Sequence, residues 1–204
     1  MKIIVVGATG TIGSAVVKAL EEDHTIVKVG NSRGDINVDL ASSDSIEKLF
    51  KQTGNFDGLI SAAGLARFGR LDELTEDDYL FGLRHKLLGQ VKLYLIGRKY
   101  INDNGSFTLT SGMLSSYPMP GSTSISMVNG GINSFVMAAA LEVERGTRIN
   151  AVSPGWVKET MEAMGMDSSS GTPAETVALA YKESLLSLRN GDINDMSIIS
   201  KLTS

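Results

Sequence analysis

The sequence predicts an α/β fold in which a doubly wound parallel sheet of about seven strands lies between two layers of helices, a three-layer α/β/α arrangement. Short apolar runs alternate along the chain with segments of helical periodicity, and this alternation is typical of parallel sheets. A second observation concerns length: 204 residues suffice for one domain with a substantial core. No repeat, low-complexity tract or linker divides the chain, so residues 1–204 are predicted to form a single domain.

The first predicted unit is a strand that leads through glycines directly into a helix. Residues 3–6 are a continuous β-branched run, as expected of a strand buried on both faces. The helix that follows has an apolar stripe at Ile12, Ala15, Val16, Ala19 and Leu20. Free N–H groups and the helix dipole make such a terminus an anion site, which predicts pyrophosphate binding in a Rossmann-like domain. The residues expected at this site are Gly7, Thr9, Thr11, Ile12 and Gly13.

The second predicted strand, residues 25–29, ends where such a fold meets the adenosine ribose. An acidic residue at this tip would bind the 2′-hydroxyl of NAD, but the tip reads Gly30, Asn31, Ser32, Arg33. Asn31, Ser32 and Arg33 therefore favour NADP over NAD, because Arg33 with Ser32 can hold a 2′-phosphate. The alternative is that Arg33 is a solvated loop charge.

The remaining elements follow in order. Further strands are predicted at 37–40, 56–61, 105–110, 148–152 and 193–199. Ser43 or Asp44 is predicted to cap one helix, and Thr172, Pro173 and Glu175 form a capping box for another. A long helix is predicted from Thr75 to near Tyr100, and its apolar stripe leaves Lys86 off the buried face.

Composition excludes several classes of function. A formal charge of -4 and a pI near 5.2 give no basic surface for nucleic acid or anionic membranes, so the expected partner is a small molecule. The chain has no cysteine and two histidines, which excludes thiol chemistry and makes a zinc site unexpected. No signal-like or membrane-spanning run is present, which predicts a cytoplasmic protein.

The order of these motifs resembles the short-chain dehydrogenase/reductase family over nearly the whole chain. Residues 7–13 look like its cofactor turn, with Thr11 where the second glycine usually stands, and residues 61–64 look like its Asn-Asn-Ala-Gly strand end. Residues 150–157 look like the segment that holds the nicotinamide carboxamide. The resemblance implies further cofactor contacts at Asp39, Leu40, Ala62, Ala63, Gly64, Asn129, Pro154, Gly155 and Val157. It also implies a homodimer or homotetramer formed through the helices from Thr75 and from about Ser124.

The catalytic positions depart from that family. Its tyrosine acid and the lysine four residues later align with Ile125 and Asn129, which cannot perform their chemistry. The family's serine falls on Ser111 or Gly112, and its helical asparagine falls on Lys86. Lys86, Ser111 and Tyr117 are therefore the candidate catalytic residues. The alternatives are that Lys86 is a surface lysine, that Ser111 only satisfies hydrogen bonds at the end of the strand, and that Tyr117 is a loop aromatic packed against a neighbour.

Two functions remain open on the sequence. One is an oxidoreductase that transfers hydride between a nicotinamide cofactor and a carbonyl or alcohol through an altered proton relay. The other is a cofactor-binding sensor or partner subunit without turnover. The segment between Trp156 and Thr172 is expected to cover the pocket, and Met161, Met164 and Met166 suggest a small or flat apolar ligand.

Overall fold

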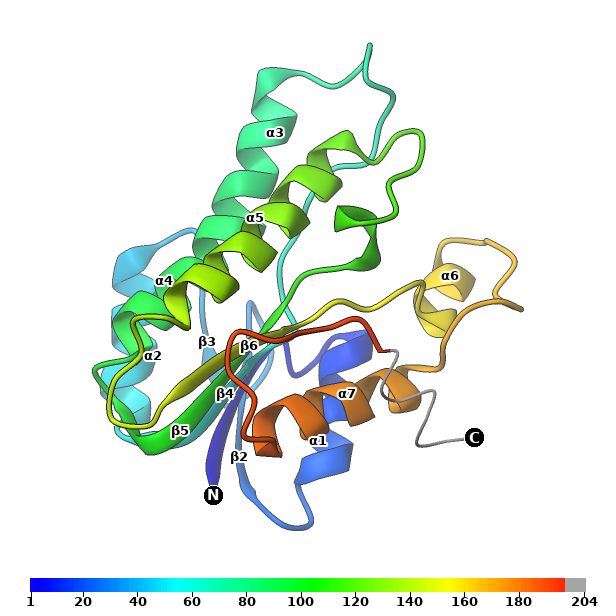
Figure 1. Ribbon diagram of the computed structural model, residues 1–204. Coiled ribbons are helices and arrows are strands. Elements are labelled where there is room, and N and C mark those ends of the chain that lie inside the picture. Colours follow the sequence, from blue (N-terminus) through cyan, green and yellow to red (C-terminus); the bar gives the residue numbers. More distant parts are fainter. Residues whose placement is uncertain (197–204) are drawn as a thin grey trace.

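A computed structural model describes residues 1–196, and its centre is one parallel sheet (Figure 1). The strand order within these residues is β3-β2-β1-β4-β5-β6-β7, and every neighbouring pair is parallel. The strands are β1 Lys2–Val6, β2 Thr25–Gly30, β3 Ile36–Asn37, β4 Phe56–Ser61, β5 Ile101–Thr110, β6 Arg148–Val152 and β7 Ile193–Asn194. The predicted Rossmann-like fold class is confirmed.

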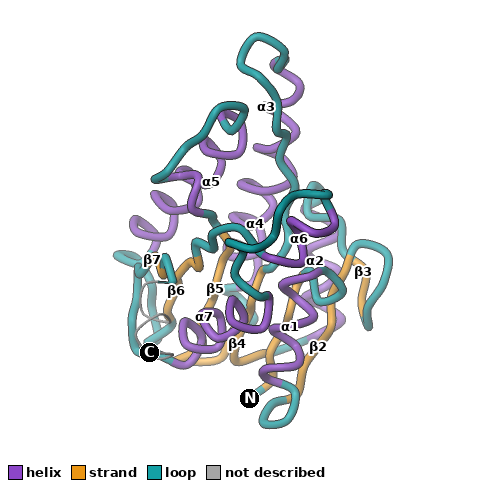
Figure 2. The backbone as a smooth tube through the Cα atoms, turned by 90° about the vertical axis from the view of Figure 1, so that its right-hand side faces the viewer, coloured by secondary structure: helices purple, strands orange, loops and turns teal. Residues whose placement is uncertain are grey.

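Helices cover both faces of the sheet. The main helices are α1 Thr11–Leu20, α2 Ser43–Thr53, α4 Leu88–Gly97, α5 Thr123–Ala139 and α7 Ala174–Leu186. Two apolar cores result, one beneath α2, α4 and α5 and the other beneath α1 and α7 (Figures 1 and 2). Ile4 and Val6 of β1 belong to the first core, whereas Ile3 and Val5 belong to the second. This alternation explains why β1 is an unbroken apolar run.

The long helix differs from the prediction because a π-helical turn interrupts it. The segment consists of α3 Glu76–Gly82, the π-helix Leu83–Leu87 and then α4. The N–H of Leu88 donates to the carbonyl of Leu83, five residues earlier, so this turn holds one residue more than an α-helical turn. The extra residue changes the register, and Lys86 is buried with 8% exposure. The prediction that Lys86 lies off the buried face was therefore wrong. The alternative interpretation, that Lys86 is a surface lysine, was wrong for the same reason.

Two helix caps also differ from the sequence prediction. Helix α2 is capped by Ser42, whose Oγ accepts from Ser45 N at 3.2 Å, rather than by Ser43 or Asp44. Helix α7 has Pro173 at its N-cap and no side-chain cap from Thr172. The carboxylate of Glu159, from the short helix α6 Lys158–Ala163, accepts from Ala174 N at 2.9 Å instead. A residue that is distant in sequence thus replaces the predicted capping box.

Strand ends differ where local turns intervene. Strand β3 ends at Asn37, because the Asp39 carboxylate accepts from Ala41 N at 2.9 Å and turns the chain toward α2. Strand β5 begins at Ile101 rather than at 105. Strand β7 covers two residues, and positions 197–199 of the predicted strand lie outside the described residues.

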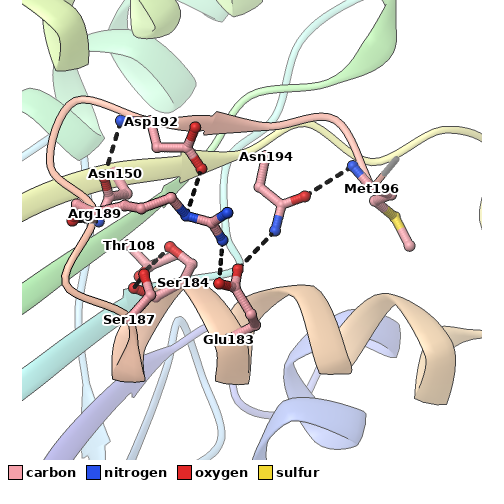
Figure 3. Close-up of polar contacts among 9 residues, drawn as sticks. All are labelled: Thr108, Asn150, Glu183, Ser184, Ser187, Arg189, Asp192, Asn194 and Met196. Carbon is pink, nitrogen blue, oxygen red and sulfur yellow. Dashed lines mark hydrogen bonds and ion pairs between the residues drawn. The ribbon is translucent and has the colours of Figure 1, made fainter. Parts of the chain in front are cut away.

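A polar cluster fixes β7 to β6 and α7 (Figure 3). Asn150 on β6 donates to Arg189 O at 2.8 Å and accepts from Asp192 N at 2.9 Å. Arg189 forms an ion pair with Glu183 on α7, and Asn194 Nδ2 donates to the same carboxylate at 3.1 Å. Side-chain hydrogen bonds therefore supplement the short β-ladder at this edge of the sheet.

Candidate active site

Two cavities adjoin at the carboxyl ends of the strands, where both are lined by Ala62, Ala63 and Gly64 after β4. The larger has a volume of about 610 Å³ and extends from the glycine turn after β1 to the end of β2. The smaller has a volume of about 240 Å³ and lies between the ends of β4, β5 and β6. This is the edge at which doubly wound folds bind ligands.

The glycine turn has a backbone that only small residues permit. Gly7 has φ +84°, and a Cβ there would lie 2.6 Å from Ala62 O. A Cβ on Gly13 would lie 2.0 Å from Gly7 O, so Gly13 allows α1 to pack directly on the turn. Helix α1 starts after Gly10 with no side-chain cap and no acidic residue in its first turn. Its first N–H groups therefore remain available for an anion.

The predicted phosphate-site residues are distributed over both cavities. Gly7 and Thr9 line the larger cavity together with Gly10, which the sequence prediction omitted. Ile12 lines the smaller cavity. Thr11 and Gly13 line neither, since Thr11 is exposed and Gly13 is packed inside the turn.

The far end of the larger cavity contains part of the predicted ribose and adenine site. Asn31, Asp39 and Leu40 line it, whereas the exposed Ser32 and Arg33 do not. The nearby Asp35 carboxylate accepts from Lys28 N at 2.8 Å.

The sequence prediction missed two aromatic residues in this cavity. Phe81 and His85 line it, with ring centroids 4.5 Å apart. Periodicity could not reveal them, because the π-helix breaks the regular register between these two positions.

Among the described residues 1–196, Lys86 is the only ionisable one that lines the smaller cavity. Its Nζ donates to Ser111 O at 3.1 Å, and among the described residues it has no carboxylate partner. Burial lowers the Lys86 pKa from 10.5 to about 8, because the cavity solvates the ammonium poorly. Gly64, with φ +137°, makes room for the lysine stem, since a Cβ there would lie 2.8 Å from Lys86 Cγ.

Ser111 and Asn129 meet Lys86 in this cavity. Ser111 is 2% exposed, and its Oγ accepts from Gly112 N at 2.6 Å, which leaves the hydroxyl proton free to donate. Asn129, also 2% exposed, donates to Gly112 O at 3.4 Å, and its Oδ1 has no hydrogen-bond partner among residues 1–196. A buried amide oxygen without a partner is costly unless a ligand donates to it.

The structure does not bring Tyr117 to this group. Its side chain is 69% exposed and lines neither cavity, so the alternative of a packed loop aromatic is also not observed. Ile125 is partly buried on α5 and likewise lines neither cavity. The cluster that the tertiary structure assembles is therefore Lys86, Ser111 and Asn129.

The end of β5 is held from both sides of the sheet. Gln90 donates to Thr110 O and accepts from Thr110 N, each at 2.8 Å. The Tyr181 hydroxyl lies 2.6 Å from Thr110 Oγ1, and burial raises the Tyr181 pKa far above its usual value. Tyr181 therefore positions Thr110, next to Ser111, and is unsuited to donate protons.

The segment after β6, which the resemblance assigns to the nicotinamide carboxamide, lies at the smaller cavity. Pro154, Gly155 and Val157 line the smaller cavity, as does Trp156 between them. The sequence prediction also missed Phe68, Met113 and Thr160 as lining residues, although Trp156 lay inside the motif that it quoted. Free N–H groups at α1, a glycine cradle and the Asn129 acceptor together fit a dinucleotide.

Comparisons with known proteins agree with this geometry. A family model described as enoyl-(acyl carrier protein) reductase matches residues 2–195. The crystal structure of the protein lin1944 from Listeria innocua is 38% identical, with a TM-score of 0.92 over 95% of this chain and 98% of that one. A small-chain dehydrogenase in complex with NADPH is 26% identical, with a TM-score of 0.86 over 95% of both chains. An uncharacterized oxidoreductase from Methylorubrum extorquens is 25% identical over 201 residues, 85% of this chain and 81% of that protein.

The fold, the two cavities and these matches place the chain in the class of NAD(P)-binding oxidoreductases. Within that class, the chain belongs to the short-chain dehydrogenase/reductase family. Among residues 1–196, no helix is long and apolar enough to cross a membrane.

Proposed function

We propose that the protein reduces a carbonyl compound with NADPH, or oxidises the corresponding alcohol with NADP, and that Lys86 replaces the usual tyrosine as proton donor. The observation that carries this proposal is the position of Lys86, buried in the smaller cavity with Nζ 3.1 Å from Ser111 O. A pKa of about 8 keeps the amine mostly protonated at neutral pH and still able to release its proton.

Each residue of the cluster has a separate role in this reaction. NADPH, when bound, supplies the hydride that reaches the carbonyl carbon. The Lys86 ammonium gives one proton to the carbonyl oxygen, which becomes the alcohol hydroxyl, and the neutral amine regains a proton from water. The Ser111 hydroxyl donates a hydrogen bond to the same oxygen and orients it. Asn129 Oδ1 accepts from a ribose hydroxyl of the cofactor, which would satisfy its unpaired oxygen.

The end of β2 supports NADP over NAD. No carboxylate occurs from Gly30 to Gly34, and the Asp35 carboxylate is held by Lys28 N. Asn31 lines the larger cavity, and the exposed Arg33 guanidinium is two residues further along the same loop. A 2′-phosphate would find a cationic and a neutral donor on this loop.

Self-association through the helices α3–α4 and α5 is part of the proposal. Exposed apolar side chains on α4 and α5 support a homodimer or homotetramer; they are Leu88, Leu95, Met127 and Met137. Sedimentation at micromolar concentration tests this, and a monomer would contradict it. A cytoplasmic location stays a prediction.

Cofactor binding and turnover are tested separately. Calorimetric titration is expected to give tighter binding of NADPH than of NADH, and cofactor absorbance then reports reduction of a panel of ketones and aldehydes. Lys86→Met is expected to retain NADPH binding and to lose about 10²- to 10⁴-fold in rate.

Lys92→Met is the matched control for this variant. Lys92 lies on α4 and donates to Ala41 O at 2.8 Å, but it lines neither cavity. Equal rates in the Lys86 and Lys92 variants would refute the role of Lys86. NADPH binding without turnover of any carbonyl would favour the cofactor-binding sensor instead.

A further inference from the structure

An aromatic wall lines one side of the smaller cavity. The rings of Phe68 and Trp156 are stacked, with centroids 6.2 Å apart and planes inclined by 27°. Phe68 belongs to the segment after β4 and Trp156 to the segment after β6, so the rings join two separate loops. Phe68 remains 45% exposed. The protein therefore leaves part of this aromatic surface uncovered at the cavity.

The segments that line the cavity also expose large apolar side chains. These segments follow β4, β5 and β6 and lie beyond the carboxyl ends of the strands (Figure 1). The first two are joined by a hydrogen bond from Gly69 N to Gly121 O at 3.0 Å. Besides Phe68, the exposed large apolar residues of the three segments, each at least 40% accessible, are Leu65, Leu71, Tyr117, Met119, Met164 and Met166. Exposed apolar side chains on the segments that line a cavity are typical of a site that binds an apolar ligand.

The cavity is poorly equipped to bind an anionic substrate. In the part of the chain that the structure describes, Lys86 is the single cation of this cavity, and its amine is already hydrogen-bonded to Ser111 O. Two arginines belong to the segment after β4, but Arg70 pairs with Asp72 and Arg67 packs over the Phe81 ring at 4.3 Å. A phosphate or a thioester-linked nucleotide would normally require several free cations or a bidentate arginine.

The space inside the cavity is small. Its volume of about 240 Å³ is below the range of about 300–1,000 Å³ that is typical of pockets for drug-sized ligands. A compact ligand of one or two rings is therefore favoured. A flat ring also gains more from Phe68 and Trp156 than a puckered one does, because only a flat ring can stack on their faces.

We infer that the substrate is a compact, uncharged carbonyl compound with a planar aromatic ring, bound against the Phe68 and Trp156 rings with its oxygen toward Lys86 and Ser111. This inference rests on the proposed reductase function and names its substrate class. It predicts that free carbonyl compounds are turned over faster than substrates carried on coenzyme A or on an acyl carrier protein.

The test compares two bicyclic ketones with the same carbon skeleton. One ring of 2-tetralone is aromatic, whereas 2-decalone is fully saturated and puckered. Trp156 is the single tryptophan of the chain, so quenching of its emission reports binding at the wall directly. We expect 2-tetralone to bind about five- to tenfold more tightly than 2-decalone, with a similar preference in kcat/KM from NADPH oxidation.

The variant Phe68→Leu is expected to remove most of this preference. Tyr117→Leu is the matched control, because Tyr117 is also an exposed aromatic residue of an adjoining loop but lines neither cavity. Phe68 is 45% and Tyr117 is 69% exposed, and leucine keeps an apolar side chain at each position, so both variants are expected to keep the unfolding midpoint of the parent protein.

The outcomes separate this inference from the reductase function. Equal binding and turnover of the two ketones, or faster turnover of acetoacetyl-coenzyme A than of either, would overturn the inference. A preference for 2-tetralone that persists in Phe68→Leu would also overturn it. Preferential quenching of Trp156 by 2-tetralone without any NADPH oxidation would uphold the ligand class and refute the reductase function.

Discussion

Replacing Lys86 with methionine is expected to stabilise the protein while it removes the proposed catalysis. Burial lowers the Lys86 pKa from 10.5 to about 8. Each pKa unit corresponds to about 1.4 kcal/mol, so the buried ammonium lowers the free energy of unfolding by about 3 kcal/mol below pH 8. Methionine preserves the apolar stem but loses the hydrogen bond to Ser111 O, worth about 1 kcal/mol. The expected net gain at pH 7 is about 2 kcal/mol.

The lowered pKa of Lys86 also makes the stability of the protein depend on pH. Between pH 8 and pH 10.5 the unfolded chain binds a proton on this lysine that the folded protein has released. The free energy of unfolding of the wild type therefore rises across that window, and Lys86→Met lacks this part of the rise. The rate of carbonyl reduction changes in the opposite direction and falls above about pH 8, because the proton donor is then neutral.

Urea unfolding at pH 7 and pH 10 measures both effects. The comparison is between wild type, Lys86→Met and the control Lys92→Met, which is expected to keep the wild-type difference between the two pH values. A Lys86→Met protein that is less stable than the wild type at pH 7, or that retains the full rise toward pH 10, would refute the reasoning.

Three further changes examine other parts of the structure. In Gly13→Val, a Cβ would meet Gly7 O at 2.0 Å, so calorimetry is expected to show NADPH and NADH binding weakened by about 100-fold or more; unchanged affinities would place the phosphate elsewhere. Arg33→Ala is expected to weaken NADPH binding about tenfold and to leave NADH binding unchanged, since it removes one charge-assisted contact; equal losses would exclude a contact with the 2′-phosphate. Glu159→Ala removes the carboxylate that caps α7 at Ala174 N and is expected to lower the free energy of unfolding by about 1 kcal/mol in urea titrations; an unchanged value would show that this cap is dispensable.

Local patterns were sufficient to predict most of the sheet. The β-branched run before Gly7 and the periodicity after it placed β1 and α1, and β4 and β6 agree with the predicted bounds. For β1 and α1 the local rules hold because β1 buries an unbroken apolar run and α1 buries an apolar stripe. Predictions failed where a distant side chain replaced a local one, as Glu159 did at the start of α7.

The candidate site could be predicted only in part. The glycine turn, residues 62–64 and the segment 154–157 are short local motifs, and they meet at the two cavities. The orientation of Lys86 depends on a π-helical turn that has no signature in an apolar stripe of period 3.6. The sequence prediction missed Phe68, because a loop residue follows no helical or strand periodicity that would indicate which cavity it lines.

The sequence by itself determined the parallel sheet and the glycine turn at its centre, since these follow from residue identity and local spacing. Only the tertiary structure decided that Lys86, Ser111 and Asn129 share one cavity while Tyr117 remains in solvent. The physical reason is that the function of a lysine depends on its solvation and its neighbours. Both were set by a helix register and by loops after β4, β5 and β6 that are far apart in the chain.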